Sequence, residues 1–210
     1  EYPPARPPVI ALTAVCGVAD DGAVIIRREH PADIEAIRSV TAAAFRSAER
    51  SAPPVDQGDD PGEATLVTWL RADAGWVPEL SLVAVEDGHV VGHVVASRAS
   101  VDGHPALGLG PLSVLPARQG SGVGAALMHA LLGAADALGE PLVALLGEPN
   151  YYRRFGFVPA HSAGVIAPDP AWGDYFQVRT LTGHSGETGR FAYADPFDRL
   201  ASTPRETVGD

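Results

Sequence analysis

Three glycines alternate with other residues just where a helix is expected to begin. Gly120, Gly122 and Gly124 lead directly into the apolar run AALMHALL. A glycine in a helix costs up to about 1 kcal/mol relative to alanine, because its backbone loses more freedom on folding. The start of a helix presents free N–H groups and the positive end of the helix dipole, and glycines let an anion approach them. The spacing predicts a phosphate-binding loop; a tight turn without a ligand is the alternative.

The same residues also fit a looser form of the dinucleotide-binding pattern, Gly-x-Gly-x-x-Gly/Ala, with Ala125 as its last small residue. In that fold a strand runs directly into the first glycine, whereas here the segment PARQ at 116–119 intervenes. The chain contains no Gly-Lys-Ser or Gly-Lys-Thr, so a Walker phosphate loop is excluded. A dinucleotide-binding oxidoreductase stays open as a less favoured reading.

A second pattern starts one residue earlier and has a partner further along the chain. Gln119 begins Gln-x-x-Gly-x-Gly, and after one more strand Tyr152 begins Tyr-x-x-x-Gly-Phe. Together these motifs resemble the acyl-CoA pyrophosphate loop and the later signature of the GCN5-related N-acetyltransferases (GNAT). The likeness spans residues 24–160, including IIRREHPADIEAI near its start, and is greatest to predicted bacterial acetyltransferases with the motifs GLGPLSVLP, QGSGVG and YYRRFGF.

The resemblance implies a mixed α/β fold, with a mainly antiparallel sheet between helices and the order β-α-α-β-β-β-α-β-α-β. It also implies acetyl-CoA as co-substrate. The loop would bind the pyrophosphate, and the strand before it would offer main-chain groups to the pantetheine and the thioester carbonyl. Asn150 resembles a cofactor-contacting residue, with helix capping as its alternative role. The implied cofactor-binding residues are Ser113, Val114, Gln119, Gly120, Ser121, Gly122, Val123, Gly124, Ala125 and Asn150.

Tyr152 is the catalytic residue that the resemblance implies, as the acid that protonates the leaving thiolate. A phenol with a pKa near ~10 can pass a proton to a thiolate whose conjugate acid has a pKa near ~8.5. Packing of the ring on a helix is the alternative, and Tyr151 is expected to pack.

No general base can be assigned from the sequence. Many relatives carry a glutamate on the strand before the loop, but LGPLSVL contains no acidic residue. Glu63, Glu86 and Glu148 are alternatives, each expected to be a solvated surface carboxylate. His93 and His104 lie near the central strands, where a single histidine is usually packed and hydrogen-bonded.

Hydrophobic periodicity gives the elements that would position these residues. An apolar strand between helices, such as PLVALLG, belongs in a sheet that is covered on both faces. Helix 122–138 is expected to turn Val123, Leu127, Ala130, Leu131, Ala134 and Leu138 inward. Strands are expected at 23–30, 80–87, 90–98, 106–115 and 141–147, with three more within 164–195, and further helices at 30–45 and 63–73. Asp87, Gly88 and His89 predict a hairpin turn between the second and third of these strands, because the turn needs a residue that tolerates positive φ.

The 210 residues fit one domain. We expect an extension or extra strand at 1–22, an acetyltransferase core at 23–160, and strands and a tail at 161–210 that complete the same domain. The single cysteine, Cys16, excludes an internal disulfide and a cysteine-based zinc site, and it fits a reducing cytoplasm. No segment is apolar for long enough to cross a bilayer, and no metal site is expected.

A net charge of −11 without a basic run disfavours nucleic acid as a partner and favours a cationic acceptor. The sequence therefore predicts a cytoplasmic, acetyl-CoA-dependent N-acetyltransferase that acts on a primary amine of a small molecule, peptide or protein. A non-catalytic acyl-CoA sensor is the other alternative, and a homodimer stays open.

Overall fold

The computed structural model describes residues 23–48, 51–55 and 58–202. The predictions for residues 1–22, Cys16 included, concern residues outside this description. The described residues form a nine-stranded sheet with the path β1-β2-β3-β4-β5-β8-β6, which β9 joins through β3. The mainly antiparallel sheet, its flanking helices and the order of elements are those that the sequence predicts. Among the described residues, no helix combines the length and apolar character needed to cross a membrane.

The first part of the sheet is an antiparallel meander, because short turns reverse the chain. Asp87 and Gly88 both have positive φ, 49° and 78°, which confirms the predicted hairpin turn between the second and third strands. The strands are β1 (Ile25–Arg28), β2 (Trp76–Glu86), β3 (His89–Val101) and β4 (His104–Val114).

Strand β2 begins earlier than the sequence predicts. Pro78 breaks the expected strand pattern because proline has no N–H to donate to a neighbouring strand. The structure accommodates it where the β2–β3 register is irregular, between the pair Trp76–Ser97 and the pair Ser81–Val95.

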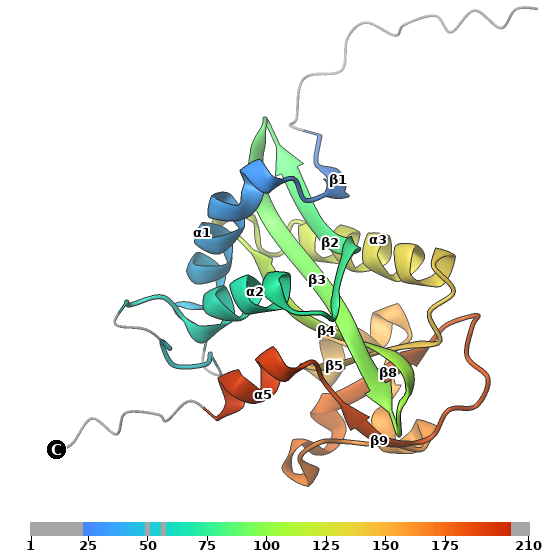
Figure 1. Ribbon diagram of the computed structural model, residues 1–210. Helices are drawn as coiled ribbons and strands as arrows, with labels where there is room; N and C mark the ends of the chain where they lie inside the picture. The colour runs from blue at the N-terminus through green and yellow to red at the C-terminus, as the bar shows by residue number, and fades with distance from the viewer. Residues whose placement is uncertain (1–22, 49–50, 56–57, 203–210) are drawn as a thin grey trace, which may run out of the picture.

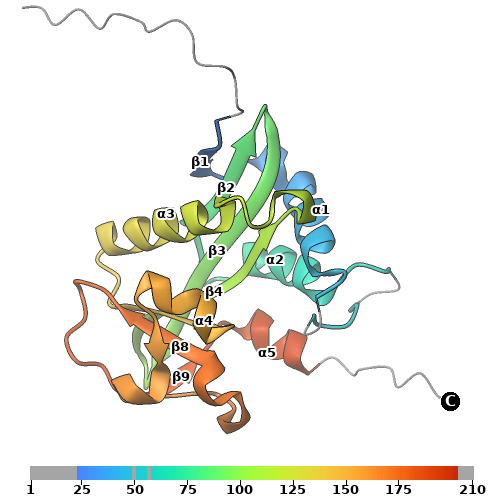
Figure 2. The ribbon, with the colours of Figure 1, turned by 180° about the vertical axis from the view of Figure 1, so that it is seen from behind.

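Helices cover both faces of the sheet (Figures 1 and 2). The short 3₁₀ turn Pro31–Asp33 leads into α1 (Ile34–Phe45), which lies with α2 (Gly62–Ala72) on one face. Helix α3 (Val123–Ala137) crosses the opposite face. It can lie close to β3 because a Cβ on Gly92 would come within 3.0 Å of Leu127 Cδ1.

The buried face of α3 differs in part from the predicted one. Leu138 is 46% exposed, because it is the C-terminal cap of the helix, and Ala130 and Ala134 are only partly buried. The residues that face the sheet are Val123, Leu127, Met128, Leu131, Leu132 and Ala135.

The chain after α3 extends the sheet on the far side of β4. β8 pairs with β5 along its length and β9 pairs with the end of β3, which supports our proposal that residues 161–202 complete the domain of residues 23–160. The first of the three predicted C-terminal strands is only two residues long, because Pro170 begins a 3₁₀ segment. The elements are β5 (Leu142–Leu146), α4 (Pro149–Tyr152), β6 (Val158–Pro159), β7 (Val165–Ile166), β8 (Phe176–Thr180), β9 (Gly189–Ala192) and α5 (Asp195–Ala201).

Candidate active site

Strands β4 and β5 lie side by side for only two residue pairs and then separate. They run parallel and pair at Leu107–Val143 and Gly108–Ala144, after which β4 continues to Val114 and β5 ends at Leu146. Within the described chain, the edge of β4 beyond Gly108 that faces β5 therefore has no strand partner. Its main-chain groups can bind a ligand that enters between the two strands.

The glycine loop follows directly from the free end of β4. Gln119 Nε2 donates a hydrogen bond to the Val114 carbonyl over 3.1 Å, which ties the loop to the strand. Gly120 and Gly122 have φ of 75° and 93°, so glycine is favoured at both positions. A Cβ at either position would meet no atom within 4 Å, which leaves open space over the backbone.

The loop presents a row of backbone donors. The first backbone bond of α3 runs from Ala126 N to the Gly122 carbonyl, and no acceptor from the described part of the chain meets the N–H groups of residues 120–125. Unpaired donors at the positive end of a 15-residue helix fit a phosphate. The donor set thus matches the pyrophosphate of a CoA-type ligand.

A pocket of about 470 Å³ opens above this loop. It brings together the loop, the end of β4, the end of α1 and the segment after β5. Its lining residues are Ala44, Phe45, Leu112, Val114, Gln119, Gly120, Gly122, Gly124, Ala125, Tyr151 and Arg154.

Four of the predicted cofactor-binding residues do not line the pocket. The Ser113 side chain is buried, where its Oγ lies 3.0 Å from Thr41 Oγ1 and donates to the His93 carbonyl. Val123 faces the sheet, and Ser121 Oγ donates to the Arg118 carbonyl. Ser113, Ser121 and Val123 could therefore serve a ligand through main-chain atoms.

Asn150, the fourth, lies exposed in the first turn of α4. Its alternative role as the helix cap is wrong, because Glu148 is the capping residue and accepts the Asn150 N–H.

Tyr152, the predicted catalytic residue, lies against Gly147 directly after β5 and is not among the residues that line the pocket. A Cβ on Gly147 would come within 2.3 Å of Tyr152 Cε2, so this glycine makes room for the ring. The ring packs edge-on against Tyr151 and Phe157, with centroids 4.9 and 5.9 Å away. Burial, together with the neighbouring Tyr151 phenol, raises the pKa of Tyr152 well above its ordinary value, so the hydroxyl stays protonated. Tyr152 therefore carries a proton at neutral pH, but the raised pKa makes it a weaker acid toward a thiolate than an ordinary phenol.

Comparison with known proteins adds independent evidence. A model of the acetyltransferase (GNAT) domain matches residues 78–159. The N-acetyltransferase YhbS of Escherichia coli K12 is 32% identical over 182 residues, covering 84% of this chain and all of that protein. The chain belongs to the GNAT family of N-acetyltransferases. A second relative, YjhQ from the same strain, is 36% identical over 150 residues, covering 67% of this chain and 83% of that protein.

Two solved GNAT structures carry the family's co-substrate or its product. E. coli YhbS in complex with CoA has a TM-score of 0.74 and 30% identity, covering 87% of this chain and 96% of that one. A GNAT acetyltransferase from Brucella melitensis in complex with acetyl-CoA has a TM-score of 0.67 and 38% identity, covering 84% and 99%. Family membership argues against the dinucleotide-binding oxidoreductase that the glycine spacing left open.

The glutamates considered as general base in this GNAT protein are engaged elsewhere. Glu86 pairs with Arg118 and so ties the end of β2 to the segment before the glycine loop. Glu148 caps α4. Glu63 is buried rather than solvated as expected, because it accepts hydrogen bonds from Ser51 Oγ and from the Ala52 N–H.

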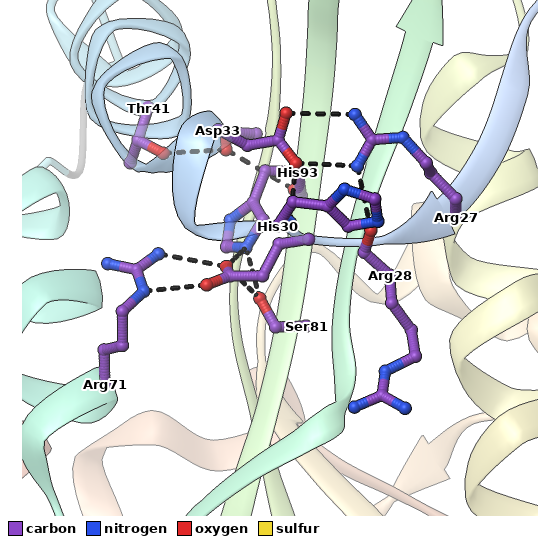
Figure 3. Close-up of polar contacts among 10 residues, drawn as sticks. Arg27, Arg28, His30, Asp33, Thr41, Arg71, Ser81 and His93 are labelled. Atoms are coloured by element: carbon purple, nitrogen blue, oxygen red, sulfur yellow. Dashed lines mark hydrogen bonds and ion pairs between the residues drawn. The ribbon is translucent and has the colours of Figure 1, made fainter.

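Sequence reasoning missed a polar network beneath α1 and α2 (Figure 3). Glu29 accepts hydrogen bonds from Arg71 Nε over 2.8 Å and from Ser81 Oγ over 2.5 Å, and Ser81 Oγ lies 2.9 Å from His93 Nε2. Burial opposes the charge on Glu29, but hydrogen bonds from His93, Arg71 and Ser81 lower its pKa to about 2. Burial lowers the pKa of His93 despite the nearby Glu29, so His93 is neutral. Ser81 and His93 could have been noticed together, because each is a single polar residue within an apolar stretch of its strand; Glu29 and Arg71 carry no such signal.

The network contacts the site through the main chain of β3, and none of Glu29, Arg71, Ser81 and His93 lines the pocket. The His93 side chain is fully buried, and its carbonyl accepts the Ser113 hydrogen bond at the free part of β4. His104, the other histidine considered, is exposed at the start of β4. Neither histidine lines the pocket.

Proposed function

We propose that this GNAT protein binds acetyl-CoA in the pocket above the glycine loop and transfers the acetyl group to an amine. The observation that carries the proposal is the row of unpaired N–H groups at residues 120–125, at the end of a strand whose edge is free. The complexes of the two related structures with CoA and acetyl-CoA support the same ligand class.

The residues act on different parts of the ligand. The loop N–H groups bind the pyrophosphate, and the main chain of Ser113 and Val114 binds the pantetheine and polarises the thioester oxygen. Acetyl-CoA supplies an activated carbonyl carbon that an uncharged amine can attack. Binding both reactants between β4 and β5 makes the reaction effectively intramolecular.

Tyr152 acts as the C–S bond breaks. A new C–N bond forms, the sulfur leaves with the bonding electron pair, and the Tyr152 hydroxyl gives that sulfur its proton; the phenolate left behind takes up a proton from solvent before the next turnover. The nitrogen loses one proton to solvent, because the described residues lining the pocket include no carboxylate or imidazole. This solvent-dependent step favours acceptor amines that are partly uncharged at neutral pH.

The acceptor is a primary amine of a small molecule, peptide or protein. A positive charge elsewhere on the acceptor, away from the reacting amine, fits the net charge of −11, which raises the local concentration of cations at low ionic strength.

Isothermal titration with acetyl-CoA and NADH, followed by a screen of amines read out as free thiol, tests the proposal. We expect acetyl-CoA to bind, NADH not to bind, and thiol release to depend on an amine. Failure of acetyl-CoA to bind refutes the proposal. Binding without thiol release for any amine indicates the non-catalytic sensor instead.

A further inference from the structure

One charged side chain stands among the described residues that line the pocket. Arg154 shares this lining with the glycine loop and with Val114. It lies in the 3₁₀ turn Arg153–Phe155 that follows α4, outside the glycine loop and at one of the unspecified positions of the Tyr-x-x-x-Gly-Phe motif. The sequence analysis assigned it no role.

Two contacts with one residue hold Arg154 at the pocket. Its guanidinium carbon lies 4.5 Å from the centroid of the Tyr151 ring, and its Nε donates to the Tyr151 carbonyl over 2.9 Å. A guanidinium over an aromatic face is attracted by the ring's electrons. Tyr151 in turn reaches the loop, because a Cβ on Gly124 would come within 2.8 Å of its hydroxyl oxygen.

The two terminal nitrogens of Arg154 are free to bind an anion. Within the described part of the chain, Arg154 lies within salt-bridge distance of no carboxylate; Arg153, Arg179 and Arg190 share this property, but they do not line the pocket. The arginines that do lie within salt-bridge distance of a carboxylate include Arg27, Arg28, Arg38, Arg46, Arg71, Arg98 and Arg118. A cationic side chain that has no carboxylate partner and lies beside unpaired N–H donors is suited to bind an anionic ligand. Guanidinium groups bind phosphate through two parallel hydrogen bonds.

We propose that Arg154, positioned by Tyr151, binds a phosphate group of CoA and complements the glycine loop. The inference rests on the proposed binding of acetyl-CoA to this pocket. Two phosphates of CoA share the required chemistry, the pyrophosphate and the 3′-phosphate. The N–H groups bind through fixed dipoles, and Arg154 adds the full positive charge that the lining otherwise lacks.

Isothermal titration of CoA into the wild type, Arg154→Ala, Arg154→Lys and Arg153→Ala tests this role. Arg153 is the matched control, because it is adjacent and exposed like Arg154 but lies outside the pocket lining. Loss of charge-assisted hydrogen bonds should weaken CoA binding roughly 10- to 100-fold in Arg154→Ala. Arg154→Lys should lose less, because it keeps the charge without the paired geometry. Arg153→Ala should stay within about twofold of the wild type, since Arg153 lies outside the pocket lining and a solvated charge without a bound partner contributes little.

Dephospho-CoA distinguishes the two phosphates. If Arg154 binds the 3′-phosphate, the wild type and Arg154→Ala bind dephospho-CoA equally; if it binds the pyrophosphate, the loss persists. Raising the salt concentration should also weaken CoA binding less steeply in Arg154→Ala than in the wild type.

Melting curves of all four proteins show whether each variant is folded. Two results would overturn the role of Arg154 and leave the proposed function standing, provided that the wild type binds CoA. One is an unchanged affinity in Arg154→Ala, and the other is an equal loss of affinity in Arg154→Ala and Arg153→Ala. Absence of CoA binding by the wild type overturns both. If Arg154→Ala does not fold, Arg154→Lys becomes the deciding variant. Wild-type affinity for CoA and an unchanged salt dependence in Arg154→Lys would exclude two parallel hydrogen bonds from the guanidinium to a phosphate.

Discussion

Replacing Tyr152 with phenylalanine separates acid catalysis from packing. The ring lies over Gly147 and against Tyr151 and Phe157, and phenylalanine can keep all three contacts. Among the described residues, the phenol makes no side-chain hydrogen bond that the substitution would break. We therefore expect the melting temperature and the affinity for acetyl-CoA to stay close to wild type.

We expect Tyr152→Phe to lower both kcat and kcat/KM about 100-fold. General acid catalysis contributes roughly 10²- to 10⁴-fold, and the lower end applies because a thiolate is already a fair leaving group. A loss of that size corresponds to about 2.7 kcal/mol of transition-state stabilisation. Because the pKa of Tyr152 is raised by burial, wild-type activity should not fall through loss of its proton up to about pH 10.

The assay is steady-state release of free thiol with the best acceptor from the amine screen, at several pH values. Titration calorimetry and a melting curve of the same variant serve as controls. A folded Tyr152→Phe protein with wild-type kcat refutes the assignment and leaves Tyr152 as a packing residue.

The remaining predictions concern the loop, the ligand and the buried network. Gly122→Asn should fold, since asparagine tolerates positive φ. It should bind acetyl-CoA at least about tenfold more weakly, because the new side chain enters the space over the N–H groups. An unchanged affinity in titration calorimetry would contradict this prediction. Coenzyme A should compete with acetyl-CoA for binding, and pantetheine alone should not. Equal competition by the two compounds would show that the glycine loop does not supply the main binding energy. Burial lowers the pKa of His93 in the folded chain, so below pH 6.5 the unfolded chain takes up this proton more readily than the folded chain. The free energy of unfolding, measured with urea, should therefore fall more between pH 7.5 and 5.5 in the wild type than in His93→Gln. Glu29 adds nothing in that window, because its stabilising effect is present above pH 4.5 and lost only as the pH falls toward about 2; equal pH dependence in both proteins would contradict the role of His93.

Local patterns predicted the elements that carry the site. Three patterns each involve residues that are close in sequence, so they can be recognised without knowledge of the fold: the glycine spacing, the Asp87–Gly88 turn and the alternation of apolar residues. The structure confirms the hairpin and the start of α3 near Gly122. The paired motifs beginning at Gln119 and Tyr152 added the family, which the comparisons support independently.

What the sequence did not predict depends on contacts between distant segments. The partners of Glu29 come from α2 and β2, 42 and 52 residues away, and no local pattern shows that they meet. The place of Arg154 in the pocket follows from its contact with Tyr151 and from where α4 sits relative to the loop. Leu138 was misassigned because helical periodicity does not indicate at which residue the helix ends.

The central claim is that the N–H groups of residues 120–125 bind the pyrophosphate of the co-substrate. Amide NMR spectra of the ¹⁵N-labelled protein test it most directly, in titrations with CoA and with pantetheine. Hydrogen bonds to phosphate should shift the amide signals of Gly120, Gly122 and Gly124 strongly with CoA and leave them nearly unchanged with pantetheine. CoA binding that shifts other amides and leaves these three glycine signals in place would contradict the claim.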